Sequence, residues 1–365
     1  MIWVVAISIS MISCKDNSKN TNKAREELPY FKVKIFETDD LNPALSDSVA
    51  FSANDHGDVI GTYTTTEGRY AYVWKDGIST TIFDDTAPEP YSVAYDLNNH
   101  GQVVGTIQDT NGLQAFVWQD GLQILTPPEN QNTSQAFAIN NQGEIVGIAG
   151  SFEEPLPVLW INNEPSYLKT LHDDLPFGEA YDVNQNGSIS GSSVTPSGLR
   201  AVIWHQADMP IDLGVLDSEA LSEFGVALNI NEAGEAVGVA AYQNTRHAFI
   251  YRDGQMHDIG DLPGGGDLSI AYGINNFSAV VGSSQVKEGD GDSQSTTKPA
   301  LLHNAFIWTP TDGLINLNSR VIEQEDLNAD ITLLEAAVIT DDYHITGRAL
   351  VNGNIRGYLL SPVTN

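Results

Sequence analysis

A unit of 42 to 47 residues recurs along this 365-residue chain and limits the folds open to it. Its clearest marker is a glycine that follows the second apolar run of each copy. These glycines are Gly61, Gly105, Gly147, Gly191, Gly238, Gly282 and Gly347. The first five steps between them are 44, 42, 44, 47 and 44 residues, and the last is 65 because of two insertions. A fixed period of this length indicates an array of identical supersecondary units.

Two further columns keep the same register. Five of the six tryptophans share one repeat position, at the end of the third run, and the column reads Trp74, Trp118, Trp160, Trp204, Tyr251, Trp308 and Leu360. An alanine occupies the first run of all seven copies, at Ala50, Ala94, Ala136, Ala180, Ala227, Ala271 and Ala336. Chance does not produce such columns, so all seven copies are expected to share one structure.

Each copy predicts a four-stranded antiparallel meander. In residues 91–128, two turn signals separate four short apolar runs, which span 92–97, 102–107, 114–118 and 122–125. The turns Asn98 to Gly101 and Asp120-Gly121 supply the positive φ that tight hairpins require. Evenly spaced short strands with such turns are typical of an all-β fold.

Alternation along the first strand predicts how the units pack. Successive side chains of a strand point to opposite faces, so Ala94 should share a small face with Ser92 and Asp96. The bulky Val93, Tyr95 and Leu97 should then form the opposite face. Sheets that nest large face into small face around a ring form a β-propeller.

The chain ends predict how the ring closes. The seventh copy has only three runs, at 334–339, 344–350 and 356–361, while residues 30–38 read as one lone strand before the first copy. If that strand completes the last blade, no open edge remains between the first and last blades. We therefore predict that residues 29–365 form a seven-bladed β-propeller of four-stranded antiparallel blades, closed by the N-terminal strand.

The N-terminus has a different character. Residues 1–13 contain an apolar run too short to span a bilayer and typical of a signal peptide. The run ends before Cys14, the only cysteine, in a pattern that resembles a bacterial lipobox, and residues 14–28 resemble a flexible tether. No Lys or Arg precedes the run, so either the start codon is misplaced or the amino terminus alone supplies the positive charge. We expect an exported lipoprotein, lipidated at Cys14 and held by its lipid at the outer membrane or cell surface.

Three segments, HAFIY at 247–251, DGQMHDIG at 253–260 and AYGINN at 271–276, resemble the bacterial HAF repeat. The end of the chain, from LNS at 317–319 to GYLLSP at 357–362, is similar to the end of such proteins, and the resemblance covers nearly all of residues 46–363. Only the fifth copy has the literal His-Ala-Phe. The resemblance implies an exported bacterial repeat protein and brings no catalytic residues.

The net charge of −31, from 17 Lys plus Arg against 48 Asp plus Glu, argues against nucleic acid as a partner, because an acidic surface repels phosphate backbones. The charge fits a soluble surface or the attraction of cations. We expect a monomer with a protein or carbohydrate ligand.

The long, variable connections lie on one face of such a propeller, and ligands are usually bound by variable loops on a rigid scaffold. The face is acidic, and no cofactor is certain. The candidate ligand-binding residues are Asp84, Asp85, Asp173, Asp174, Arg200 and Arg246. A Ca²⁺ site is conceivable at Glu288, Asp290 and Asp292, since Ca²⁺ takes carboxylate oxygens from flexible loops. The alternative there is a solvated acidic loop.

No zinc-binding spacing and no Ser-His-Asp order occurs. The sequence therefore favours a non-catalytic binding or interaction module at the cell envelope. One alternative is a carbohydrate-active enzyme, a polysaccharide lyase or glycoside hydrolase that uses acidic residues on the long-loop face. Another is a structural surface protein. The catalytic residues of any such enzyme stay unknown at this point.

Overall fold

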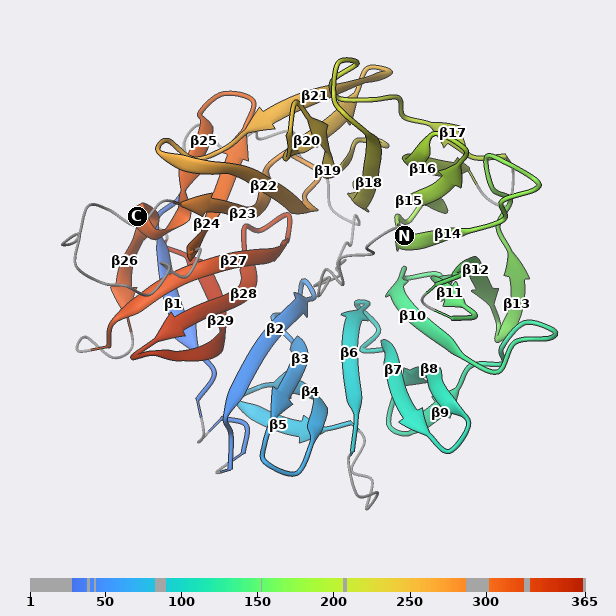
Figure 1. The fold of residues 1–365 in the computed structure, drawn as a ribbon. Helices are drawn as coiled ribbons and strands as arrows, with labels where there is room; N and C mark the ends of the chain where they lie inside the picture. Colours follow the sequence, from blue (N-terminus) through green and yellow to red (C-terminus); the bar gives the residue numbers. More distant parts are fainter. Residues whose placement is uncertain are drawn as a thin grey trace, which may run out of the picture.

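The computed structural model describes residues 28–37, 40–42, 44–82, 90–151, 153–205, 209–286, 302–324 and 329–363. Regular structure in these residues is β-strand, apart from one 3-10 helix. Short antiparallel sheets stand around a common centre, and the first strand of each lies innermost (Figure 1). The chain is thus an all-β protein with a propeller-like arrangement of small sheets.

Three separate four-stranded sheets come first along the chain. The first unit holds β2 (Asp47–Ala53), β3 (Val59–Thr64), β4 (Arg69–Lys75) and β5 (Ile78–Thr81). The second holds β6 (Ser92–Leu97), β7 (Val103–Asp109), β8 (Gly112–Trp118) and β9 (Leu122–Ile124). The third holds β10 (Ser134–Ile139), β11 (Ile145–Ala149), β12 (Leu156–Ile161) and β13 (Glu164–Tyr167).

The next three units are joined into one 12-stranded sheet. The fourth holds β14 (Gly178–Val183), β15 (Ser188–Thr195), β16 (Gly198–His205) and β17 (Ile211–Asp212). The fifth holds β18 (Glu223–Ile230), β19 (Ala236–Tyr242), β20 (Thr245–Arg252) and β21 (Gln255–Gly260). The sixth holds β22 (Gly265–Ile274), β23 (Val280–Val286), β24 (Leu302–Thr309) and β25 (Gly313–Asn316). Short parallel pairings of β16 with β18 and of β20 with β22 make the joins, which the repeat pattern did not predict.

The last unit combines both ends of the described chain. It holds β27 (Ile331–Ile339), β28 (Ile345–Val351) and β29 (Asn354–Pro362). Next to β29 lies β1 (Phe31–Ile35), antiparallel to it from Phe31 opposite Pro362 to Ile35 opposite Tyr358. In Figure 1 the blue β1 accordingly lies among red strands.

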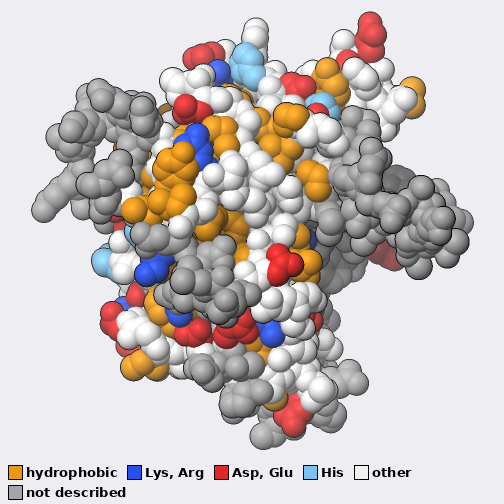
Figure 2. All heavy atoms as spheres, turned by 90° about the vertical axis from the view of Figure 1, so that its left-hand side faces the viewer, with side chains coloured by type: hydrophobic (Ala, Val, Ile, Leu, Met, Phe, Trp, Pro, Cys, Tyr) orange, Lys and Arg blue, Asp and Glu red, His pale blue; other side chains and the backbone are white. Residues whose placement is uncertain are grey.

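A fifth strand in the last unit departs from the predicted four. After the 3-10 helix η1 (Leu317–Arg320), β26 (Val321–Gln324) pairs in parallel with the outer edge of β1. An uncovered strand edge presents unpaired backbone groups, and β26 covers this one. Figure 2 shows the side of the molecule that carries β1 and β26, where apolar side chains lie between acidic and basic ones. The acidic excess does not form a uniform coat on this side.

A β-bulge in each first strand overturns the predicted division into a small and a large face. In β6, Ala94 pairs with Gly105 and Asp96 pairs with Val104, so Tyr95 is an extra residue. The bulge breaks the alternation, and Ala94 and Leu97 consequently pack in one hydrophobic cluster between the first and second units. Tyr95 instead packs against a cluster shared by several units. A side chain at Gly105 would collide with the Val93 carbonyl and the Phe116 ring, which explains the glycine column.

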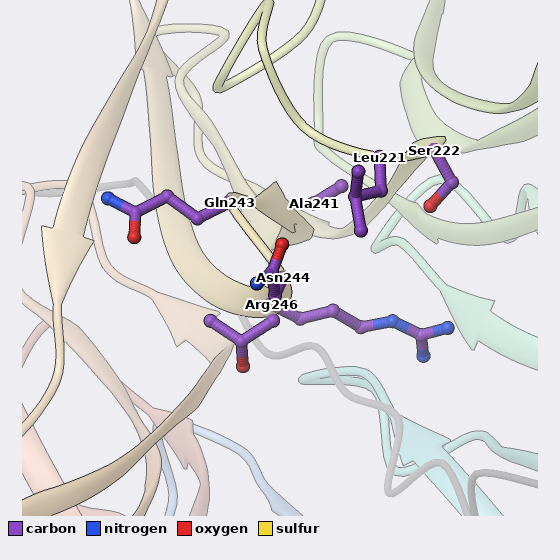
Figure 3. Close-up of a pocket in the computed structure, with 7 residues that line it drawn as sticks. Leu221, Ser222, Ala241, Gln243, Asn244 and Arg246 are labelled. Atoms are coloured by element: carbon purple, nitrogen blue, oxygen red, sulfur yellow. The ribbon is translucent and has the colours of Figure 1, made fainter.

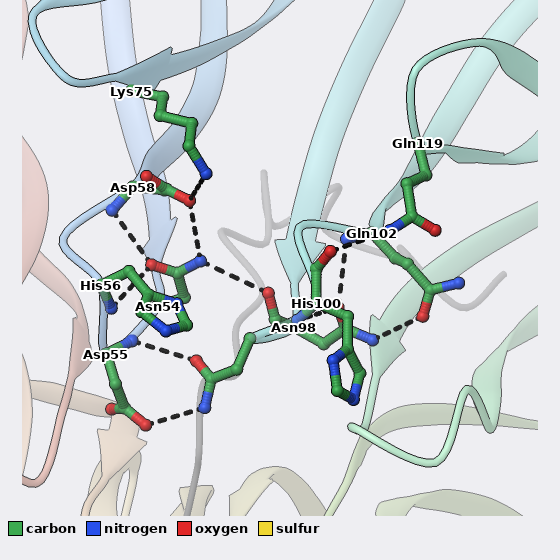
Figure 4. Close-up of polar contacts among 10 residues, drawn as sticks. Asn54, Asp55, His56, Asp58, Lys75, Asn98, His100, Gln102 and Gln119 are labelled. Carbon is green, nitrogen blue, oxygen red and sulfur yellow. Dashed lines mark hydrogen bonds and ion pairs between the residues drawn. The ribbon is translucent and has the colours of Figure 1, made fainter.

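Asparagines of the short turns connect neighbouring units. The Nδ2 group of each donates to the backbone oxygen of the equivalent residue in the next unit, over 2.9 to 3.4 Å, and its Oδ1 accepts the backbone N–H groups two and four residues later. We call these residues the asparagine belt: Asn54, Asn98, Asn140, Asn184, Asn231 and Asn275. Figure 4 shows its first link. In the last unit Thr340 takes the place of asparagine and accepts the bond from Asn275.

Candidate functional site

Several predicted site residues lie outside the described residues. These are Cys14, Asp84, Asp85, Glu288, Asp290 and Asp292. Among the residues that the structure does describe, no group of three or more His, Cys, Asp or Glu side chains is arranged to hold a metal ion. No helix in that part of the chain is long and apolar enough to cross a membrane.

The structure does not bring the other predicted residues into one site. Asp173 and Asp174 are exposed in the connection before β14. Arg200 forms ion pairs with Asp212 at 3.1 Å in its own unit and with Glu223 at 2.9 Å in the next unit. Hydrogen bonds from Ser197 and Arg200 lower the pKa of the Glu223 carboxyl. Arg200 therefore links the fourth unit to the fifth through ion pairs.

The third to the last units contribute apolar side chains to one cluster, most of them from first strands. We call this group the axial cluster. It comprises Phe137, Ile148, Tyr181, Val226, Leu228, Val239, Tyr272 and Val338, with Tyr95, Leu199, Phe224 and Ile270 packed against it. Ring contacts run from Phe51 to Tyr95, Phe137 and Tyr181, with centroids 5.5 to 6.0 Å apart. Polar side chains next to this cluster are partly withdrawn from water, which changes their protonation.

Four polar side chains meet where the sixth unit packs against the last. We call Tyr272, His303, Glu335 and Arg348 the quartet. Nη2 of Arg348 donates to Oε2 of Glu335 over 3.0 Å. The Tyr272 hydroxyl also hydrogen bonds Glu335, and His303 lies close enough to Glu335 and Arg348 for both charges to affect its pKa. The four residues come from β22, β24, β27 and β28.

Irregularities in the backbone of β22 and β27 lie at or next to two of these residues, Tyr272 and Glu335. Tyr272 is the extra residue of the bulge in β22, between Ala271 opposite Gly282 and Gly273 opposite Val281. The register between β27 and β28 shifts twice, once between Leu333 and Glu335 and once between Ala336 and Val338. Bulges recur beside active sites because they redirect a side chain without ending the strand. Tyr272 thus occupies the bulge position that recurs in every first strand, whereas the shift before Glu335 is additional to that bulge.

Burial shifts the pKa values of Tyr272 and His303 in opposite directions. Burial raises the pKa of the Tyr272 hydroxyl, and the Glu335 carboxylate raises it further. Burial lowers the pKa of His303, against the opposing effect of Glu335. At neutral pH Tyr272 therefore keeps its proton while His303 is a neutral acceptor. The Glu335 side chain is 4% exposed but that of Arg348 is 39% exposed, so one end of the quartet reaches solvent.

Two further carboxyl groups of inner strands have raised pKa values. Burial raises the pKa of Glu179, in β14, to about 7. Burial also raises the pKa of Asp96, and the nearby Asp182 carboxylate adds to the effect. Asp96 is fully buried and accepts from the Ser52 hydroxyl and the Ile139 backbone N–H. Asp96 thus connects three units, whereas Glu179 is only half-buried and is placed to exchange a proton near neutral pH.

Arg246 borders a cavity of about 210 Å³ at the tip of the hairpin formed by β19 and β20 (Figure 3). Its guanidinium lies 3.8 Å from the centre of the Phe224 ring, and Phe224 packs against the axial cluster. Burial lowers the pKa of Arg246. This predicted residue is therefore next to a cavity, unlike Arg200.

The quartet was missed at the sequence level, although its signal was present. The residue before the column alanine is Val49, Val93, Gln135, Glu179, Val226, Ile270 or Glu335. Two glutamates thus interrupt a mainly apolar column. The residue after the column glycine is small or apolar in six copies and Arg348 in the seventh. Departures from the repeat, rather than the repeat itself, mark the site.

A comparison with protein families finds no match, and no curated protein matches the chain. Solved structures do match. One is a gluconolactonase from Xanthomonas campestris, described as important in glucose secondary metabolic pathways. It is 13% identical, covers 72% of this chain and 82% of its own, and has a TM-score of 0.36. That protein is an enzyme, whereas the sequence favoured a non-catalytic module. At this level of similarity its reaction and substrate say nothing about those of this chain.

Proposed function

We propose that the protein is a carbohydrate-active enzyme that breaks glycosidic bonds by acid–base chemistry at the quartet. The observation that carries the proposal is the set of Tyr272, His303, Glu335 and Arg348 between the sixth unit and the last, in which a protonated hydroxyl and a neutral imidazole lie beside a cation. Perturbed groups with a specific charge partner are typical of functional sites.

Each member of the quartet has a role that its surroundings support. His303 accepts a proton from the substrate or from an attacking water, because burial keeps the imidazole neutral. Tyr272, the protonated hydroxyl of the set, donates a proton to the departing sugar oxygen. Arg348 stabilises negative charge that develops on the substrate, and Glu335 positions Arg348 and Tyr272 by hydrogen bonds. Such acid–base catalysis contributes about 10²- to 10⁴-fold.

The test is depolymerisation of a panel of neutral and acidic polysaccharides by the full chain. Reducing ends report any bond cleavage, and ultraviolet absorbance of unsaturated ends separates elimination from hydrolysis. Tyr272→Phe and His303→Gln should each lower the rate by about 10²-fold or more. Tyr167→Phe and His257→Gln alter the same residue types on outer strands and should leave the rate unchanged. The proposal fails if no polysaccharide is cleaved, or if all four variants cleave like the parent.

We also propose that the scaffold is a seven-bladed β-propeller closed by β1. In support, six units follow one strand pattern, and the last unit takes its remaining strand from the N-terminal end of the described chain. The sequence columns give the same number of units. An experimental structure with another number of blades, or with β1 away from β29, would contradict this proposal.

Export and lipid attachment at Cys14 are a further proposal, supported by the lipobox-like pattern and by the resemblance to HAF-repeat proteins. Labelled fatty acid should be incorporated into the full chain in a bacterial host. Cys14→Ser should abolish the incorporation, and equal labelling of both chains would disprove it.

A further inference from the structure

The cavity beside Arg246 lies where two segments of the fifth unit meet. The tight turn between β19 and β20 forms one wall and the segment before β18 forms the other. The backbone N–H of Gln243 donates to Asp217 over 2.9 Å, which ties the turn to that segment. In Figure 3 the side chains of Leu221 and Ser222 lie across from Asn244 and Arg246. The cavity is therefore bounded by segments that hydrogen bonds hold together.

Arg246 differs from three other arginines in its partners, while Arg69, at the equivalent position of the first unit, likewise lies over an aromatic ring, that of Tyr91. Arg200, Arg348 and Arg356 each form an ion pair with a carboxylate. In the described part of the chain, no acidic side chain lies within ion-pair distance of Arg246, although the net charge is −31. Its guanidinium stacks on Phe224 instead, which fixes its plane and leaves the N–H donors for a ligand. A planar fork of donors suits a carboxylate.

The remaining walls suit hydroxyl groups and a small apolar surface. Ser222, Gln243 and Asn244 contribute neutral hydrogen-bonding side chains, and Leu221 and Ala241 contribute apolar surface. The volume of the cavity is about 210 Å³. That is room for one sugar ring and too little for an oligosaccharide. The positive charge of Arg246, the neutral hydrogen-bonding side chains and the small volume of the cavity together suit a single sugar unit that carries a carboxylate.

We propose that this cavity binds the carboxylate of an acidic sugar unit, so that the substrate of the enzyme is an acidic polysaccharide. The inference rests on the proposed function for its link to catalysis. The structural link is Phe224, which contacts Arg246 on one side and packs against the axial cluster that includes Tyr272 on the other.

Calorimetric titration of the full chain with glucuronate and with glucose tests the binding directly, because the two sugars differ in the carboxylate. Glucuronate should bind, and glucose should bind at least about tenfold more weakly. Arg246→Gln should weaken glucuronate binding by about tenfold or more, while Arg246→Lys, which keeps the charge but not the fork, should weaken it less. Arg252→Gln is the matched control, since Arg252 belongs to the same strand and stacks on Trp308 away from the cavity.

The outcomes separate this inference from the proposed function. Glucuronate binding that depends on Arg246, without any polysaccharide cleavage, would support the cavity and overturn the enzyme. Cleavage of neutral polysaccharides that Arg246→Gln does not slow would support the enzyme and overturn the cavity. Equal binding of both sugars, no binding of either, or equal loss in the Arg246→Gln and Arg252→Gln variants would also overturn the inference.

Discussion

The two ends of the inner strands use polar residues in opposite ways. At the short-turn end, the asparagine belt repeats the same hydrogen bonds from one unit to the next. Away from that end, Glu179, Glu335, Arg246 and Arg348 occupy repeat positions that most other units fill differently. A polar group present in every repeat meets a need that every repeat has, which is attachment to its neighbour. A polar group present in only one or two units does not meet that shared need.

The difference also appears in the energetics of the groups. Each belt asparagine is buried, and both its Nδ2 and its Oδ1 have partners. Glu179 is half-buried with a raised pKa, and the Nε of Arg348 is a buried donor without a partner among the described residues. Unsatisfied buried polar groups cost stability, and one also lies at the short-turn end, where Nε1 of Trp74 has no hydrogen-bond partner among the described residues. The comparison can be tested by substitution at each end.

The largest effect on stability is expected in the belt. Asn140→Ala removes the bond to the Asn184 carbonyl and leaves the N–H groups of Gln142 and Glu144 without their acceptor. We expect a loss of roughly 2–4 kcal/mol in the free energy of unfolding, measured by urea denaturation. Asn111→Ala, in an exposed turn that joins no units, should change it by less than about 0.5 kcal/mol. Similar values for both variants would show that the belt does not stabilise the unit interfaces.

At Glu179 we expect the opposite effect on stability, because its substitution should stabilise the protein at high pH. Its folded pKa of about 7 lies above the ordinary value of 4.5, so the folded state holds a proton that the unfolded state releases between those pH values. Stability from this group is therefore lost as the pH rises through that window. Glu179→Gln should flatten the decline and be more stable than the parent above about pH 7, with little difference below about pH 4.5. The urea midpoints of the parent and the variant across this pH range measure the difference in stability. A variant less stable than the parent at high pH would refute the distinction between the two ends.

Much of the fold could be predicted because it is repetitive. The glycine column follows from close contact with a neighbouring carbonyl, and the turns follow from Asp120-Gly121 and from Asn98 to Gly101, where Asp120 and Gly101 have a positive φ. The bulge could not be predicted, because one extra residue in β6 leaves the composition of the strand unchanged and only shifts Tyr95 into the centre. The fifth strand of the last unit could not be predicted either, because β26 contacts β1 from almost the other end of the chain.

The candidate site was much less accessible from the sequence. Acidic residues in long connections were chosen because variable loops often bind ligands, yet Asp173 and Asp174 are simply exposed. The quartet lies instead on four strands, and its members are brought together by the packing of two units. His303 and Glu335 are 32 residues apart, and no local pattern reports that distance in space. Only comparison of each copy with the other six could have singled out Glu335 and Arg348.

The smallest effect is expected at Arg200, and it refines the comparison. This arginine recurs only as Arg356 in the last unit, and it pairs with Asp212 and Glu223 near the surface, where side chains of both acids are about 40% exposed. Exposed ion pairs contribute little, so Arg200→Gln should cost at most about 1 kcal/mol and less at high salt. It should leave polysaccharide cleavage unchanged, since Arg200 belongs neither to the quartet nor to the Arg246 cavity. A strong loss of cleavage with unchanged stability would instead place Arg200 in the functional set, and rarity within the repeat would then be a better guide to function than the partners of a side chain.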